Sequence, residues 1–328
     1  MWQASSMSHS LETRGLYLAI YVLTILTGFP TNLLALYALI QKLKTKATPN
    51  TILLLNLTLS DLCFLAFLPF KISEDVSGHW SLPNYLCPLS GLFYFSSIYS
   101  TTLFLTALSV ERYLGVAYPV RYRLKRHLPY VVVASFGLWV CSFAHCSIVY
   151  ITEFYPGNYS LINNSCYKNF TKDQLAILLP VRLELGIVLF LVPSLITCFC
   201  YFGFMRIVIT SAHIRRSKKQ RAVGLVAATL AVFIICFSPY NVSHVYGFIQ
   251  GDSPDWREEA LLPSTFNASF DPFIFYFSSS AVQHSCWSFL TRIEQLFTLP
   301  PFIRKLFCPR TQKMGRTRSP ELVSCSKL

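Results

Sequence analysis

The sequence predicts an all-α membrane protein, a bundle of seven transmembrane helices, from two observations. Its 328 residues have a mean hydropathy of +0.46 and only 13% charged residues, whereas soluble domains carry about 25%. Its apolar residues gather in seven long stretches, and a helix needs about 20 such residues to cross the hydrocarbon core of a bilayer. The polar segments between the stretches are short, so we expect one bundle and no second folded domain.

The seven stretches follow one another along the whole chain, over residues 15–40, 50–71, 88–114, 130–150, 177–209, 221–249 and 260–279. Each contains a polar or helix-kinking residue: in chain order Asn32, Asp61, Arg112, Trp139, Pro193, Pro239, and Asn267 with Asp271 and Pro272. Residues 1–14 are predicted to be an extracellular segment and 15–280 the seven-helix domain. Residues 281–328 are predicted to form a short amphipathic helix and a cytoplasmic tail.

The net charge of +13 is distributed by side of the membrane. Most lysines and arginines lie after the first, third and fifth stretches and in the tail, while the opposite side holds Arg14, Lys71, Lys168, Lys172 and Arg257. Basic residues near span ends mark the cytoplasmic face, so we expect a multi-pass protein with its N-terminus outside. The basic excess suits anionic membrane lipid or an acidic partner and does not indicate a nucleic-acid-binding protein.

The loop between the fourth and fifth stretches carries the modification signals expected of an outer loop. Three glycosylation triplets begin at Asn158, Asn163 and Asn169. Of the eleven cysteines, only Cys87 and Cys166 face an oxidising compartment in this topology, so we predict a disulfide between them. For Cys286 and Cys308, after the last stretch, a lipid anchor and a free thiol are both open.

Two arginines and a histidine occupy the outer ends of the last three stretches. Arg182 lies in the first turns of the fifth, His244 five residues after Pro239, and Arg257 just before the seventh. Guanidinium forks suit a carboxylate, so these residues predict a site for a small anion. An Arg182–Glu184 ion pair is the poorer reading, because helix residues two apart face different ways. Arg257 could instead reach water, and His244 could bond a backbone carbonyl.

Aromatic residues are expected to wall this site, and core packing is the plainer reading of any one of them. We expect a ligand or supporting contact from His145, and walls from Tyr94, Phe95, Tyr99 and Tyr240.

The polar residues inside the stretches together resemble the rhodopsin-like (class A) G-protein-coupled receptors, from about Gly28 to Tyr276. The matching markers are Asn32; Asp61 in Leu59-Ser60-Asp61; Cys87; Glu111-Arg112-Tyr113; Trp139; Pro193; Phe237-Ser238-Pro239; and Asp271-Pro272. The chain departs from the pattern in having Phe237 where the family usually has tryptophan. Tyr276 also stands one place later than the family's seventh-span tyrosine.

The resemblance implies a cytoplasmic activation switch. Arg112 would either pair with Glu111 or be released and then stabilised by Tyr201. The other residues expected to take part in the switch are Tyr113, Phe237 and Tyr276. Partners of such receptors are heterotrimeric G proteins, with arrestin as a further expectation. Asp61 and Asp271 would face the family's sodium and water pocket. They could hold Na⁺ or form a hydrated polar network that joins helices.

Longer stretches are similar to the free fatty acid receptors that respond to short-chain carboxylates. They are Leu179 to Glu184, Pro239 to His244, Asn267-Ala268-Ser269, Tyr276 to Ser280 and Leu68-Pro69-Phe70-Lys71. The resemblance implies that Arg182, Arg257 and His244 hold the carboxylate. The implied agonists are acetate, propionate and butyrate, signalling runs through Gi/o and in one subtype also Gq, and the subtype stays open.

Other functions fit less well. A receptor for a hydroxycarboxylate is the nearest alternative, and a nucleotide would need more basic groups. A transporter would show an inverted repeat or broken helices, and the cytoplasmic switch would go unexplained. The spans contain no metal-ligand cluster and no nucleophile–base pair, so we do not expect an enzyme or a metalloprotein.

Overall fold

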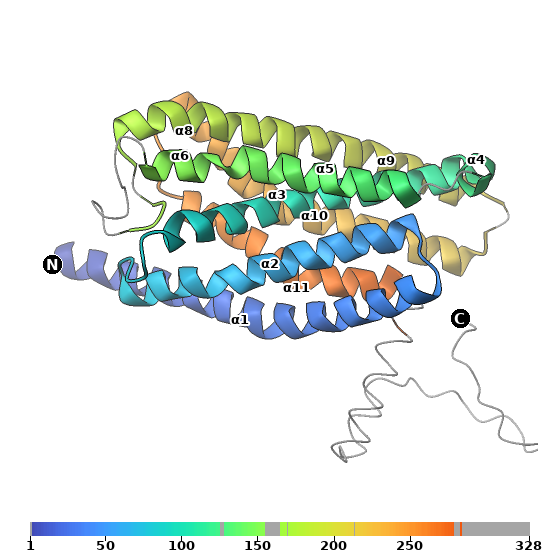
Figure 1. The fold of residues 1–328 in the computed structure, drawn as a ribbon, viewed down its shortest axis with the longest axis horizontal. Helices are drawn as coiled ribbons and strands as arrows, with labels where there is room; N and C mark the ends of the chain where they lie inside the picture. The colour runs from blue at the N-terminus through green and yellow to red at the C-terminus, as the bar shows by residue number, and fades with distance from the viewer. Residues whose placement is uncertain are drawn as a thin grey trace, which may run out of the picture.

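The computed structural model describes residues 2–124, 128–154, 165–168, 170–212, 214–278 and 283. These residues form long helices that run side by side, with their connections at the two ends of the bundle (Figure 1). In chain order the elements are α1 Trp2–Thr45, α2 Pro49–Ser77, α3 Leu86–Ala117, α4 Pro119–Leu124, α5 Leu128–Cys146, α6 Ile148–Phe154, α8 Lys172–Leu185, the π-helix η1 Gly186–Leu191, α9 Val192–Thr210, α10 Arg216–Gln250 and α11 Arg257–Ser278.

Among the described residues, six helical segments are long and apolar enough to cross a membrane: Arg14–Thr45, Pro49–Ser77, Leu86–Ala117, Leu128–Phe154, Lys172–Thr210 and Arg216–Gln250. The seventh predicted span is α11, which packs against α10 and α1. Its lower hydropathy has a structural reason, because its polar residues Ser264, Thr265, Asn267 and Asp271 are buried in the bundle. The predicted seven-helix bundle is therefore confirmed.

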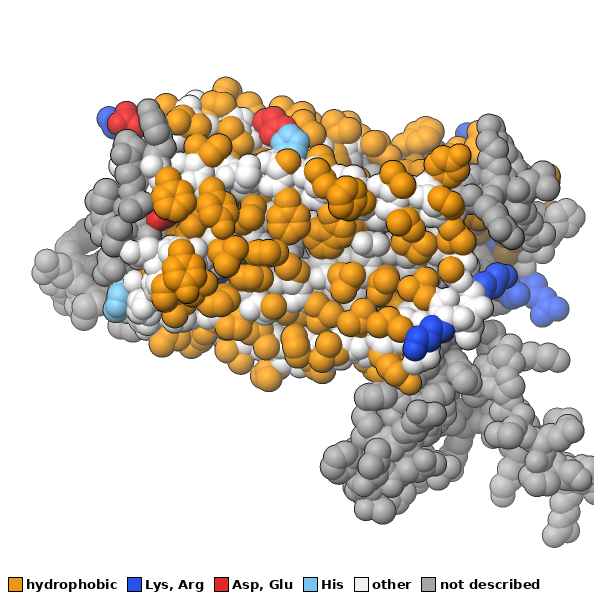
Figure 2. Space-filling view, viewed as in Figure 1, with side chains coloured by type: hydrophobic (Ala, Val, Ile, Leu, Met, Phe, Trp, Pro, Cys, Tyr) orange, Lys and Arg blue, Asp and Glu red, His pale blue; other side chains and the backbone are white. Residues whose placement is uncertain are grey.

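The long side of the bundle is apolar, as contact with lipid requires. Figure 2 shows hydrophobic side chains over most of this side, with lysine and arginine concentrated at the end opposite the N-terminus. A soluble protein would bury such a surface, since large apolar patches are rare on soluble monomers. The chain is a multi-pass membrane protein.

Local signals set the helix ends. Thr48 caps α2 by accepting a hydrogen bond from the Thr51 backbone N–H, Pro49 stands in the first turn, and Gly78 ends the helix with φ 73°. Thr171 and Gln174 form a capping box at the start of α8. The π-helix η1 ends just before Pro193. A proline supplies no N–H to the preceding turn, which favours such a wide turn.

The helices extend past the apolar stretches that predicted them. The first begins at Trp2, and the second continues to Ser77, where Gly78 caps it. The fourth span divides into α5 and α6 at Ser147. Apart from Gln283, the predicted amphipathic helix and tail, with Cys286 and Cys308, lie outside the described residues.

The predicted disulfide between Cys87 and Cys166 is confirmed, with 5.6 Å between the Cα atoms. It joins the first turn of α3 to residues 165–168 of the connection between α6 and α8. This bond holds the segment against the end of the bundle at which α8, α10 and α11 meet.

Candidate functional site

The three predicted cationic residues lie buried at the end of the bundle that carries the disulfide. Arg182 projects from α8, His244 from α10 and Arg257 from the first turn of α11, and their exposed fractions are 3%, 2% and 4%. Charged side chains are rarely this buried unless they are paired. Their partners therefore decide what the site can bind.

The two guanidinium groups keep donors without a protein acceptor. Arg182 Nη1 donates to Ser253 Oγ at 3.2 Å, while its Nη2 has no hydrogen-bond partner among the described residues. Arg257 Nη1 lies 3.9 Å from Glu258 Oε1, and its Nε likewise has no partner in the described part of the chain. Glu184 faces away and bonds His145, so Arg182 is not neutralised by its own helix.

Two aromatic rings of the connection between α6 and α8 bring the arginines to one place. The Arg182 guanidinium carbon lies 5.8 Å from the centroid of Tyr167 and 4.8 Å from that of Phe170. For Arg257 the corresponding distances are 5.7 and 6.0 Å, and its guanidinium also lies 5.8 Å from the ring of Tyr240. Cation–π attraction of about 0.5–2 kcal/mol each partly offsets the burial of the two charges.

Tyr167 adopts an unusual backbone conformation. Its φ of 59° is the only positive value at a non-glycine residue among those described. For a bulky residue this left-handed region costs about 1–3 kcal/mol and persists only where the surroundings impose it. Burial raises the pKa of the Tyr167 phenol, although the two nearby arginines oppose that shift, so the phenol is neutral and can donate a hydrogen bond.

His244 is held by a second tyrosine. Tyr99 Oη lies 3.1 Å from His244 Nε2, and it also donates to Asn241 Oδ1 at 3.4 Å. The imidazole packs edge-on to Tyr240, with 4.4 Å between ring centroids. Its Nδ1 is buried and without a hydrogen-bond partner within the described structure, which leaves one ring nitrogen for a ligand.

These side chains line a small cavity, which we name the anion cavity. Its lining includes Phe95, Tyr99, Tyr167, Arg182, Tyr240 and His244. The volume open to the centre of a water-sized sphere is about 10 Å³, room for about one such sphere. Cationic donors around so small a cavity suit a small anion better than a bulky one such as a nucleotide.

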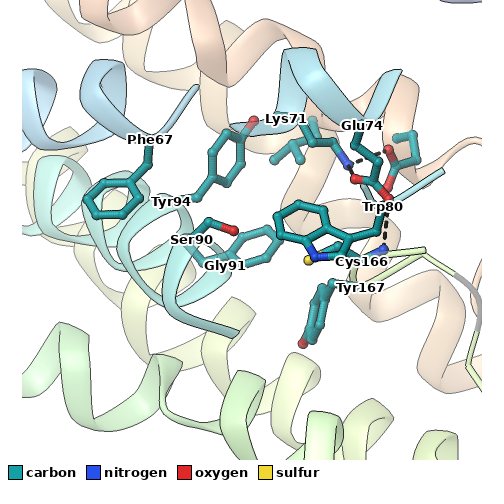
Figure 3. A pocket seen from close by; sticks show the side chains of 12 residues that line it. Phe67, Lys71, Glu74, Trp80, Ser90, Gly91, Tyr94, Cys166 and Tyr167 are labelled. Atoms are coloured by element: carbon teal, nitrogen blue, oxygen red, sulfur yellow. Dashed lines mark hydrogen bonds and ion pairs between the residues drawn. The ribbon is translucent and has the colours of Figure 1, made fainter. Parts of the chain in front are cut away.

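A second cavity adjoins the first, and we name it the outer polar cavity (Figure 3). On the same measure it has about 40 Å³. Its polar lining consists mainly of Lys71 and Glu74 from α2 and Glu258 from α11, and the nitrogen of Lys71 lies 3.7 Å from Glu74 and 3.3 Å from Glu258. The rings of Phe95 and Tyr167 line both cavities.

Three of the expected ligand contacts do not line the anion cavity. Arg257 lies next to it, against the rings of Tyr167 and Tyr240, and two others lie elsewhere. Tyr94 lines the outer polar cavity and not the anion cavity. Successive helix residues point about 100° apart, so Phe95 reaches both cavities whereas Tyr94 reaches only the outer polar cavity. His145 lies at the α5–α8 boundary, where its Nδ1 is 3.0 Å from Glu184 and its side chain is 32% exposed. Neighbouring Cys146 takes the inward-facing position on that helix.

At the opposite end of the bundle, Glu111 and Arg112 line a third, larger cavity of about 340 Å³ together with residues of α9 and α10. Glu111 Oε1 and both terminal nitrogens of Arg112 have no hydrogen-bond partner in the part of the chain described, and neither has the buried Tyr201 hydroxyl. The Glu111–Arg112 pair is thus not closed in this structure. Tyr113 packs on Gly203, where an added Cβ would lie 2.6 Å from its ring.

The remaining switch residues lie in the middle of the bundle. Asp61 lines a small pocket with Phe237 and Asn267, and Asn267 Nδ2 donates to Asp271 Oδ2 at 2.8 Å. One oxygen of each aspartate has no hydrogen-bond partner among the described atoms. Sodium binding here stays a prediction. The side chain of Tyr276 and the asparagines at 158, 163 and 169 lie outside the described residues.

Sequence reasoning did not single out Tyr167, Phe170 or Ser253 as site residues. The first two have a signal in hindsight, because Cys166 ties this segment to α3 and aromatic residues beside such an anchor must lie over the cavity. Ser253 has no comparable signal, since its contact with Arg182 depends on how the α10–α11 connection folds back.

Comparisons with known proteins agree with this architecture. Residues 31–281 match the 7 transmembrane receptor (rhodopsin family). Among curated relatives, free fatty acid receptor 3 of Mus musculus is 46% identical over 313 residues, which cover 94% of this chain and 97% of the relative.

Two further receptors extend the comparison. Free fatty acid receptor 2 of Rattus norvegicus is 48% identical over 275 residues, covering 82% of this chain and 83% of the relative. Free fatty acid receptor 1 of Mesocricetus auratus is 32% identical over 270 residues, covering 79% and 90%. The chain is therefore a member of the rhodopsin family of G-protein-coupled receptors, a receptor and not an enzyme, and groups with the free fatty acid receptors.

Proposed function

We propose that this chain is a plasma-membrane receptor for short-chain carboxylates such as acetate, propionate and butyrate, with its N-terminus outside the cell. One observation carries the proposal: the Arg182 guanidinium and the His244 imidazole line a small aromatic cavity. The Arg257 guanidinium lies against two of the same rings, and all three side chains keep a buried nitrogen without a hydrogen-bond partner among the described residues. Arg182, Arg257 and His244 are the proposed ligand contacts, with Tyr240 and Phe95 as walls.

The energetics favour an anion at this place. Two buried cations close to the same rings are costly, and one carboxylate removes a unit of that positive charge while accepting several hydrogen bonds. Each charge-assisted hydrogen bond contributes about 1.5–3 kcal/mol. Two or three of them would account for a headgroup that binds with little help from a hydrophobic tail.

The size of the cavity supports short acids. The rings of Phe95, Tyr99, Tyr167 and Tyr240 close in on the cationic nitrogens, so the space beyond a carboxylate is narrow. The names of the relatives point to the same class of compound, since three free fatty acid receptors align with most of this chain.

We further propose that agonist binding promotes engagement of a Gi/o protein, and also Gq, at the opposite end of the bundle. The larger cavity lined by Glu111 and Arg112 is wide enough for side chains of a partner helix, and the unpartnered Arg112 nitrogens offer it donors. Arrestin could dock on the same face. Two alternative arrangements of the Glu111–Arg112 pair would supply the two-state element that a switch requires.

The test is a concentration–response series from formate through hexanoate, with lactate included, on cells that express the full chain. Inhibition of cAMP formation and calcium release report Gi/o and Gq separately. Arg182→Ala should abolish the response, whereas Arg14→Ala, at an exposed arginine of the same end, should leave it intact.

Surface expression of every variant is measured alongside. A wild-type chain that reaches the surface and ignores all carboxylates would refute the proposal. A response to lactate that exceeds the one to propionate would instead assign the site to hydroxycarboxylates.

A further inference from the structure

The connection between the disulfide and α8 is attached to α2 by two acidic residues, Glu74 and Asp75. Glu74 Oε1 accepts a hydrogen bond from the Cys166 backbone N–H at 2.7 Å, shown dashed in Figure 3. Asp75 Oδ1 accepts one from Lys168 Nζ at 2.7 Å, and this lysine is also 3.9 Å from Glu74. These contacts hold the residues on both sides of Tyr167.

The position of these acids within α2 indicates a tertiary role. They lie three and two residues before the last residue of α2, Ser77, where the helix dipole disfavours negative charge. Both are nevertheless buried, with exposed fractions of 2% and 8%. The helix end and the burial therefore both disfavour the ionised carboxylates of Glu74 and Asp75. Contacts with Lys71, Lys168 and the Cys166 N–H compensate for this cost.

The residue held between the two contacts separates the two outer cavities. Tyr167 has the left-handed backbone described above, and its ring lies 5.3 Å from that of Phe95. These two rings line both the anion cavity and the outer polar cavity. The disulfide fixes Cys166 alone and leaves the following backbone free to turn, so the contact with Lys168 is what completes the constraint on Tyr167.

We propose that Glu74 and Asp75 are positioning residues that hold Tyr167 against Phe95, and that this aromatic wall limits the receptor to short carboxylates. The inference rests on the proposed function, because the wall matters only to a carboxylate held by the arginines. With the wall in place, a longer chain meets two rings. With Tyr167 released, the chain enters the outer polar cavity, whose other walls include Phe67, Trp80 and Leu261.

The experiment compares hexanoate with propionate on the full-length receptor through the ratio of their EC50 values, which cancels changes in expression and coupling. Lys168→Gln and Asp75→Asn should each lower this ratio, by about fourfold for every methylene that gains an apolar contact. Tyr167→Ala, which removes the wall itself, should lower it at least as much. Lys172→Gln removes the same charge from an exposed site nearby and should leave it unchanged.

A charge-swapped pair separates positioning from a general effect of charge. Asp75→Lys combined with Lys168→Glu recreates opposite charges at the same place, so its ratio should return toward the wild-type value. If the receptors with single substitutions do not reach the cell surface, the double variant provides the test. An EC50 ratio of the double variant equal to that of Tyr167→Ala overturns the inference.

Two further outcomes count against the inference and are distinguishable. Wild-type ratios in Lys168→Gln and Asp75→Asn, with a wild-type receptor that answers propionate, show that the Asp75–Lys168 contact does not hold the aromatic wall. They overturn this inference and leave the proposed function standing. A wild type silent to every carboxylate overturns the proposed function and this inference with it.

Discussion

Replacing Arg182 by methionine should abolish the response to carboxylates and yet stabilise the ligand-free receptor. The side chain is buried, and its charge is compensated by one hydrogen bond to Ser253 and by the rings of Tyr167 and Phe170. Methionine has a similar length, carries no charge and packs well against aromatic rings.

The magnitude follows from the groups lost. The hydrogen bond to Ser253 contributes about 1.5–3 kcal/mol as a charged donor, and the two cation–π contacts about 0.5–1 kcal/mol each. Against these stand the several kcal/mol needed to bury an incompletely paired ion and its repulsion by Arg257. We expect the free energy of unfolding to rise by about 1–2 kcal/mol, or a few degrees in Tm for a protein of this size.

The assay is thermal unfolding of purified receptor in detergent or nanodiscs, followed by a fluorophore that reacts with the buried thiols of Cys146, Cys200 and Cys236. Added propionate should raise the Tm of the wild type and leave that of Arg182→Met unchanged. A ligand-free Tm several degrees below wild type would show that Arg182 is a structural ion and would refute the reasoning.

Three other predictions concern the supports of the site. Cys87→Ser and Cys166→Ser should reduce surface expression and ligand potency equally, because each breaks one shared bond; clearly unequal losses would contradict that. Tyr99→Phe should raise the EC50 of propionate about three- to tenfold by removing the hydrogen bond that orients His244, which a potency series in cAMP inhibition would measure. Gly247→Ala should lower thermal stability, since its Cβ would stand 2.8 Å from a carbonyl oxygen of the connection after α10, and an unchanged Tm would disprove this steric argument.

Much of the fold was predictable because its signals are local. The length of an apolar stretch decides whether it can cross a bilayer, and Cys87 and Cys166 stand out once the topology is assigned. The ends of the helices were not predictable to the same degree, because the caps at Thr48 and Gly78 and the break between α5 and α6 depend on backbone contacts.

The candidate site was predictable in its residue types and less so in its arrangement. Buried arginine is rare enough in a span to draw attention to Arg182 by itself. The placement of Tyr94 and His145 could not be predicted from the sequence. A rotation of about 100° about the helix axis moves a side chain from one cavity to another or to the α5–α8 boundary.

By itself, the sequence determined that this is a seven-helix membrane protein with a disulfide at one end and cationic residues at the ends of its last three spans. These properties depend on residue type and spacing along the chain, and both are printed in the sequence. Only the tertiary structure decided that Tyr167 separates two cavities and that Glu74 and Asp75 hold it there. The reason is that these contacts join residues more than 90 positions apart, and no local pattern encodes such a distance.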